Sequence, residues 1–206
     1  MNLIQRIDRF IDRVTEWIYE RYRDHTRDEL CIALQGLGIN AQMSERGRPE
    51  EEITSRWFES LMLGVKYLGI IEVQNPMIRW VGVKKHNTRD KDGYGEIYYE
   101  IEYGIPYSTS SHSLSKVRIR TKHNKRNTMS GKVIDLKWEG KDFGLGLIEN
   151  LNHDVLLKKP LMDIKEDLGI RYYHKHSCWI LTTGRVDISA DLWDCYQGIA
   201  RRLLGS

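Results

Sequence analysis

A row of alternating cations in the middle of the chain is the feature best suited to binding a negatively charged partner. Lys116, Arg118, Arg120 and Lys122 occur at every second position, and small or apolar residues stand between them. Alternate side chains of a β-strand point to the same face, so a strand here would project all four cations from one side. Such a row predicts a surface that neutralises the phosphates of a nucleic acid.

Three more cations lie in or beside the turn that follows. These are Lys125, Arg126 and Lys132, around the stretch "HNKRNTMSG". From residue 105 to residue 142 there are nine Lys or Arg against three Asp or Glu, while the whole chain has a net charge of only +3. The positive excess is therefore local, and we interpret it as a basic β-hairpin.

An acidic segment upstream offers a second interpretation of the same cations. Residues 96–103 alternate apolar with polar positions, which predicts a strand whose outward face carries Glu96, Glu100 and Glu102. Consecutive strands often pair, and opposite charges facing across strands contribute about 0.2–1 kcal/mol per pair. Whether these glutamates neutralise the basic strand stays open at this point.

The segment "VIDLKW" contains Asp135 and Lys137 in the D-x-K spacing of magnesium-dependent nucleases. This resembles the PD-(D/E)xK class, in which the acid binds Mg²⁺ and the lysine helps to activate water. The class also needs an acid on the preceding strand, and residues 108–134 contain no Asp or Glu. Only Glu100 or Glu102 is available, so a degenerate nuclease is kept as an alternative.

His174, His176 and Cys178 have the spacing of metal ligands on an unbroken strand, but no fourth ligand stands at a suitable distance. With Cys31 and Cys195, the cysteines form neither a disulfide framework nor a zinc motif. No Walker or Rossmann glycine pattern is present. We therefore expect no metal and no cofactor.

The C-terminal half indicates an α+β domain over residues 94–206. Three strands near residues 97–103, 116–122 and 132–138 precede a helical stretch that ends near Pro160. A strand or tight hairpin covers residues 170–183, and Ser189 caps a closing amphipathic helix. This order predicts an antiparallel sheet with helices packed on one face.

The N-terminal half predicts three helices, over residues 3–24, 26–38 and about 48–69, followed by a hairpin around Asn75 and Pro76. This order resembles a winged-helix domain over about residues 8–85, within a domain of residues 1–86. The expected recognition helix begins with Glu50, Glu51 and Glu52, which would repel phosphate. The apolar stripe of the first helix also fits a dimer seam.

The composition is that of a globular protein, and no apolar run approaches the roughly 20 residues that cross a bilayer. We expect a cytoplasmic protein with no membrane contact. The function predicted best is non-enzymatic nucleic-acid binding through the basic hairpin. A protein-interaction module that self-associates through its N-terminal helix, and the degenerate nuclease, are the alternatives.

Overall fold

The computed structural model describes residues 24–44, 65–89, 95–108, 112–125, 133–164 and 167–205. The described elements, in chain order, are α2 (Thr26–Gly36), β1 (Ala41–Met43), β2 (Val65–Val73), β3 (Trp80–Arg89), β4 (Gly95–Pro106), η1 (His112–Lys116), β5 (Arg118–Lys125), β6 (Val133–Lys141), α4 (Leu147–His153), α5 (Val155–Asp163), β7 (Gly169–Tyr173), η2 (His174–His176), β8 (Cys178–Thr183) and α6 (Ala190–Leu204).

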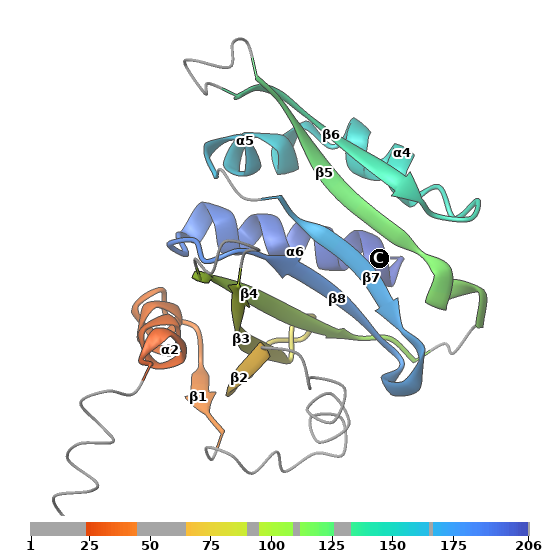
Figure 1. The fold of residues 1–206 in the computed structure, drawn as a ribbon. Helices are drawn as coiled ribbons and strands as arrows, with labels where there is room; N and C mark the ends of the chain where they lie inside the picture. The colour runs from red at the N-terminus through yellow and green to blue at the C-terminus, as the bar shows by residue number, and fades with distance from the viewer. Residues whose placement is uncertain are drawn as a thin grey trace, which may run out of the picture.

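The eight described strands form one antiparallel sheet in the order β1-β2-β3-β4-β8-β7-β5-β6. The tight hairpin β7-η2-β8 inserts between β4 and β5, as Figure 1 shows. The predicted α+β class with an antiparallel sheet is thus confirmed. The expectation that the strands of residues 97–103 and 116–122 pair with each other is wrong, because two strands separate them.

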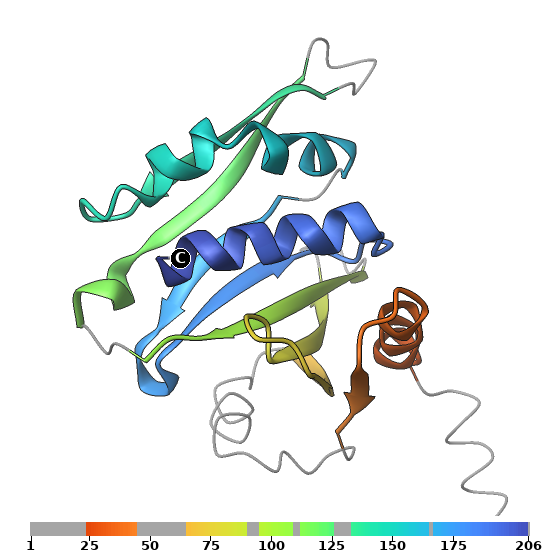
Figure 2. The same ribbon diagram turned by 180° about the vertical axis from the view of Figure 1, so that it is seen from behind.

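The helices pack on one face of this sheet. Viewed from behind, α4, α5 and α6 lie in front of the strands (Figure 2). Inward side chains of the strands, such as Tyr103, Trp138 and Leu181, form one core with Tyr196 and Ile199 of α6. Strand alternation and the 3.6-residue period of α6 place these residues inward, and Ser189 caps α6 through the amide of Leu192, as predicted.

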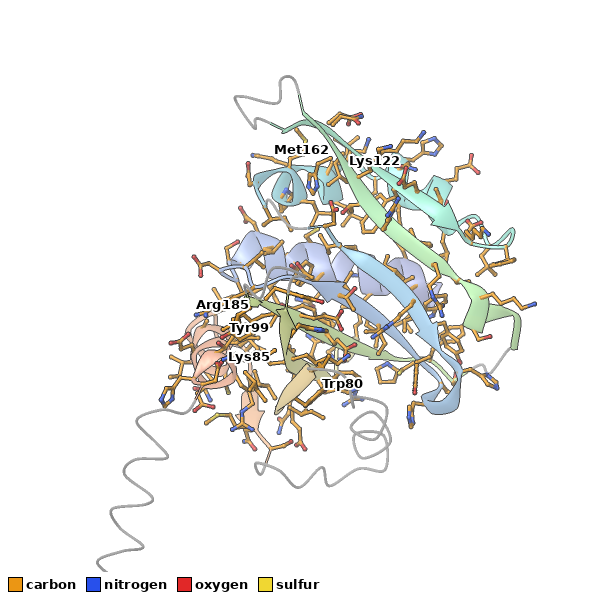
Figure 3. The ribbon with its side chains drawn as sticks, viewed as in Figure 1. Trp80, Lys85, Tyr99, Lys122, Met162 and Arg185 are labelled. Atoms are coloured by element: carbon orange, nitrogen blue, oxygen red, sulfur yellow. The ribbon has the colours of Figure 1, made fainter. Side chains whose placement is uncertain are left out.

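Helix α2 joins the same core and is held by a polar clamp. The carboxylate of Asp24 accepts hydrogen bonds from Lys85 Nζ at 2.7 Å and from the Tyr99 hydroxyl at 2.8 Å. Arg185 lies over the Tyr99 ring, 5.5 Å from its centroid, and bonds to Glu29 at 2.7 Å. Figure 3 shows Lys85, Tyr99 and Arg185 gathered beside α2.

Strand β6 lies at one end of the sheet, and its outer edge is capped by a side chain. Asn152 of α4 accepts a hydrogen bond from the Trp138 amide at 2.8 Å and donates one to the Trp138 carbonyl at 3.0 Å. The amide group therefore takes the place of a neighbouring strand. Such capping limits edge-to-edge association of sheets.

The N-terminal half differs from the winged-helix expectation. Residues Val65 to Gly69, expected to end a third helix, belong to strand β2. Strand β3 continues through His86 to Arg89, past the predicted end of the first domain at residue 86. Antiparallel pairing of β2 with β3 and of β3 with β4 outweighs the local helical spacing. The first helix with its dimer seam, and Glu50 to Glu52, lie outside the described residues.

Candidate nucleic-acid interface

Three of the four predicted strand cations lie on the sheet face opposite the helices. Arg118, Arg120 and Lys122 alternate with the core residues Ile119 and Thr121 along β5, as the sequence pattern predicts. Lys122 is marked in Figure 3, which looks onto this face. Lys116, which the sequence placed on the same strand, instead ends the short helix η1, and its side chain is exposed. The side chain of Lys125, together with Arg126 and Lys132, lies outside the described residues.

Strand β6 adds cations that the sequence analysis did not include in the site. The register places Lys141 opposite Arg118, and Lys137 opposite Lys122. Both β6 lysines are exposed. The alternation of charges from residue 135 to residue 141, combined with hairpin pairing, is the signal that could have identified them.

Glu139 is the acidic partner of this row. Its Oε1 atom accepts hydrogen bonds from Arg120 Nε at 3.1 Å and Nη2 at 3.0 Å, and Lys122 Nζ lies 3.8 Å from Oε2. The Arg120 and Lys122 side chains are nevertheless 72% and 63% exposed. Exposed ion pairs contribute about 0–1 kcal/mol, so these cations stay available to a stronger anion.

A further cation lies on the other side of β5 from β6 and extends the surface. Arg171 of β7 stands opposite Arg118 in the register. Lys141, Arg118 and Arg171 are therefore direct neighbours across three strands of the same face. We call Arg118, Arg120, Lys122, Lys137, Lys141 and Arg171 the basic face. Arg171 was missed because its neighbours are set by pairing between distant segments.

The acids of β4 bind different cations from those expected. Lys84 Nζ donates to Glu102 Oε1 at 2.6 Å and to Glu100 Oε1 at 3.0 Å. Arg171 Nη2 also donates to Glu102 Oε1. The question that the sequence left open is answered for Glu100 and Glu102, which do not pair with the cations of β5 because β8 and β7 lie between β4 and β5. The side chain of Glu96 lies outside the described residues.

Glu102 is fully buried, although the alternation of β4 predicts a solvent-facing side chain. Burial raises the pKa of Glu102. The positive charges of Lys84 and Arg171 act in the opposite direction but do not cancel this rise. Burial also acts on Glu100, but Lys84 and Arg171 outweigh it and lower the pKa of that carboxyl. The network therefore holds two neighbouring carboxyl groups whose pKa values are shifted in opposite directions.

Aromatic rings cover part of this network. Trp80 lies so close to Gly104 that a Cβ atom at this position would be 1.9 Å from Trp80 Cε2. A Cβ atom at Gly82 would likewise be 2.2 Å from the Tyr67 hydroxyl. Trp80 also packs in a second apolar cluster with Cys178 and Ile180, separate from the main core. The outer face thus has an apolar part over β3, β4 and β8 and a basic part over β5, β6 and β7.

A groove of about 700 Å³ lies within the basic face. At Gly169, the absence of a side chain lets Thr182 pack against the strand, since a Cβ atom there would be 2.5 Å from Thr182 Oγ1. Its lining comes from β4 to β8 and comprises Glu100, Arg118, Ile119, Arg120, Glu139, Gly140, Lys141, Gly169, Ile170, Arg171 and Thr182. The groove therefore joins four of the six cations of the basic face.

The other candidate chemistry of the sequence does not assemble in the described part of the chain. Asp135 is exposed and accepts a hydrogen bond from the amide of Leu136, while β5, β7 and β8 separate its strand from Glu100 and Glu102. His174 and His176 lie in a 3₁₀ turn rather than a strand. Among the described residues, no three His, Cys, Asp or Glu side chains cluster as metal ligands.

The described cysteines are buried. Burial raises the pKa of Cys178 and of Cys195 to about 12, so neither thiol is an activated nucleophile. In the described segments, no helix combines the length and apolar character needed to span a membrane. Comparison with protein-family models, curated proteins and solved structures finds no match.

Proposed function

We propose that this protein binds nucleic acid through the basic face, chiefly by contacts with phosphates. The observation that carries the proposal is the row Lys141, Arg118 and Arg171, in which three cations stand side by side across three strands. Like charges directly opposite each other destabilise a sheet. A bound polyanion removes that cost, which gives the arrangement a use in binding.

The spacing along β5 supports the same assignment. Arg118, Arg120 and Lys122 are about 6.8 Å apart, because each strand residue rises about 3.4 Å. This separation is close to that of successive phosphates along an extended nucleic-acid strand. The sequence places Lys125, Arg126 and Lys132 at the turn between β5 and β6, and we include them in the proposed surface.

Phosphate contacts position a nucleic acid without reading its bases. The basic face presents arginine and lysine side chains, whereas the aromatic rings of Trp80 and Tyr67 are packed over Gly104 and Gly82. We therefore propose binding with little sequence preference and a strong dependence on salt.

A charge-reversal variant tests the proposal. Lys137→Glu/Lys141→Glu alters two exposed β6 side chains, and Lys159→Glu/Arg201→Glu changes the net charge equally on exposed helix positions. Fluorescence anisotropy with labelled single-stranded and duplex oligonucleotides of random sequence measures the affinity of each. We expect the β6 variant to lose binding and the helix variant to retain most of it. Equal losses in the two variants would refute a localised interface.

A further inference from the structure

The three arginines of the groove are each held in position by hydrogen bonds. Arg171 Nη2 donates to the buried carboxylate of Glu102. Arg120 donates twice to Glu139, and Arg118 Nη1 donates to the carbonyl oxygens of Ser115 at 2.8 Å and Val117 at 2.6 Å. Positioned guanidinium groups lose less conformational entropy when they bind an anion.

The charges of the groove lining leave a defined excess. Arg118, Arg120, Lys141 and Arg171 contribute four positive charges, and Glu100 and Glu139 contribute two negative ones. Below the groove, the ionised forms of Lys84 and Glu102 would cancel each other. The lining therefore has a positive excess of two.

A phosphate monoester matches this excess better than a phosphodiester does. A monoester carries about −1.5 to −2 charges at neutral pH and has three terminal oxygens that accept charge-assisted hydrogen bonds. A phosphodiester in the middle of a strand carries only one charge. Gly169 lies in the lining of this groove, where it pairs with Arg120 of β5 on one side and with Thr182 of β8 on the other.

We propose that this groove binds the terminal phosphate monoester of a nucleic-acid strand. The inference rests on the proposed function, because the rest of the strand would follow the basic face along β5 and β6. The groove thereby distinguishes the phosphorylated end of a strand from its interior.

Binding of matched oligonucleotides tests this inference. Anisotropy titrations compare short single-stranded thymidine oligomers that carry a 5′-phosphate, a 3′-phosphate or only hydroxyl ends, at about 0.1 M salt. We expect one phosphorylated end to bind about tenfold more tightly than the hydroxyl form, which corresponds to about 1.4 kcal/mol. Equal affinity for all three oligomers would overturn the terminal subsite and leave the proposed function standing. No binding of any oligomer would overturn both.

Substitutions locate the effect in the groove. Arg171→Lys keeps a positive charge beside Glu102 but loses the planar fork, and Arg120→Gln alters an exposed side chain whose loss should leave the fold intact. Both should reduce the advantage of the phosphorylated end to about twofold or less. Arg202→Gln, at an arginine paired with Asp154 on the helix side, should preserve it. An advantage that survives in both groove variants would contradict the assignment.

Competition with a free mononucleotide distinguishes the source of the phosphate. Thymidine monophosphate offers the same monoester without the remaining strand. We expect it to displace the phosphorylated oligomer only at concentrations far above the dissociation constant of the oligomer. Equally tight binding of the mononucleotide would identify a small-molecule site and overturn the proposal of a strand end.

Discussion

Neutralising one like-charged pair of the basic face should weaken binding and leave stability nearly unchanged. Lys122 and Lys137 stand directly opposite each other on β5 and β6 and are both exposed. Replacing both with Gln removes a repulsion worth about 0.2–1 kcal/mol. The change also removes the long 3.8 Å contact between Lys122 and Glu139, which is worth about 0–1 kcal/mol. Because the two terms oppose each other, we expect a free energy of unfolding within about 1 kcal/mol of the wild-type value.

The same substitutions should weaken nucleic-acid binding. Each phosphate contact contributes about 0.7 to the slope of log affinity against log salt for a single strand, so two lost contacts flatten the slope by about 1.4. If the affinities of the two proteins are equal near 1 M salt, the variant binds about 25-fold more weakly at about 0.1 M salt.

Urea denaturation and anisotropy titrations over a salt series measure the two effects. The control is Lys159→Gln/Arg201→Gln, which removes two charges from exposed helix positions. If the control and the β-sheet variant show the same salt slope, net charge alone drives binding. That result would refute the reasoning from strand register.

Three further predictions concern the scaffold. Asn152→Leu leaves the Trp138 amide and carbonyl without their partner. It should lower the free energy of unfolding by about 1–3 kcal/mol and increase light scattering when the protein is concentrated. Wild-type values of both would contradict edge capping. Gly104→Ala should lower the free energy of unfolding, measured by thermal denaturation, by about 1–3 kcal/mol because Trp80 must move. A variant as stable as the wild type would contradict the close contact. Burial of Asp24 opposes ionisation, but the hydrogen bonds to its carboxylate outweigh this effect and lower the pKa. The contribution of Asp24 to folding stability is therefore complete above the unfolded pKa of about 3.9 and is lost progressively as the pH falls below that value. The stability gap to Asp24→Asn should therefore narrow below about pH 4, and a constant gap would contradict the clamp.

Local patterns in the sequence predict which face a residue occupies. The alternation around Arg118 and Arg120 places both on one side of β5, and the helical period of α6 places Tyr196 and Ile199 in the core. These features depend on periods of two and 3.6 residues, which operate within a single element. Local physical chemistry is sufficient for them.

Partners across the sheet depend on topology, which local patterns do not encode. Arg171 lies beside Arg118 only because the hairpin β7-β8 inserts between β4 and β5. Glu102 is buried because Lys84 and Arg171 meet it from two other strands. Strand β2 likewise forms by pairing with β3, even though the spacing of Val65 and Leu68 fits a helix. The candidate site could therefore be predicted as a basic strand, but its groove could not.

Chemical footprinting of lysines tests the central claim most directly. The accessible lysines of the wild-type protein are acylated with and without a saturating oligonucleotide, and the modified positions are identified by mass spectrometry. The account predicts protection of Lys122, Lys137 and Lys141 on the basic face, with unchanged labelling of the exposed Lys159 on α5. Protection of Lys159 alone, or equal protection of Lys159 and the basic face, would contradict it.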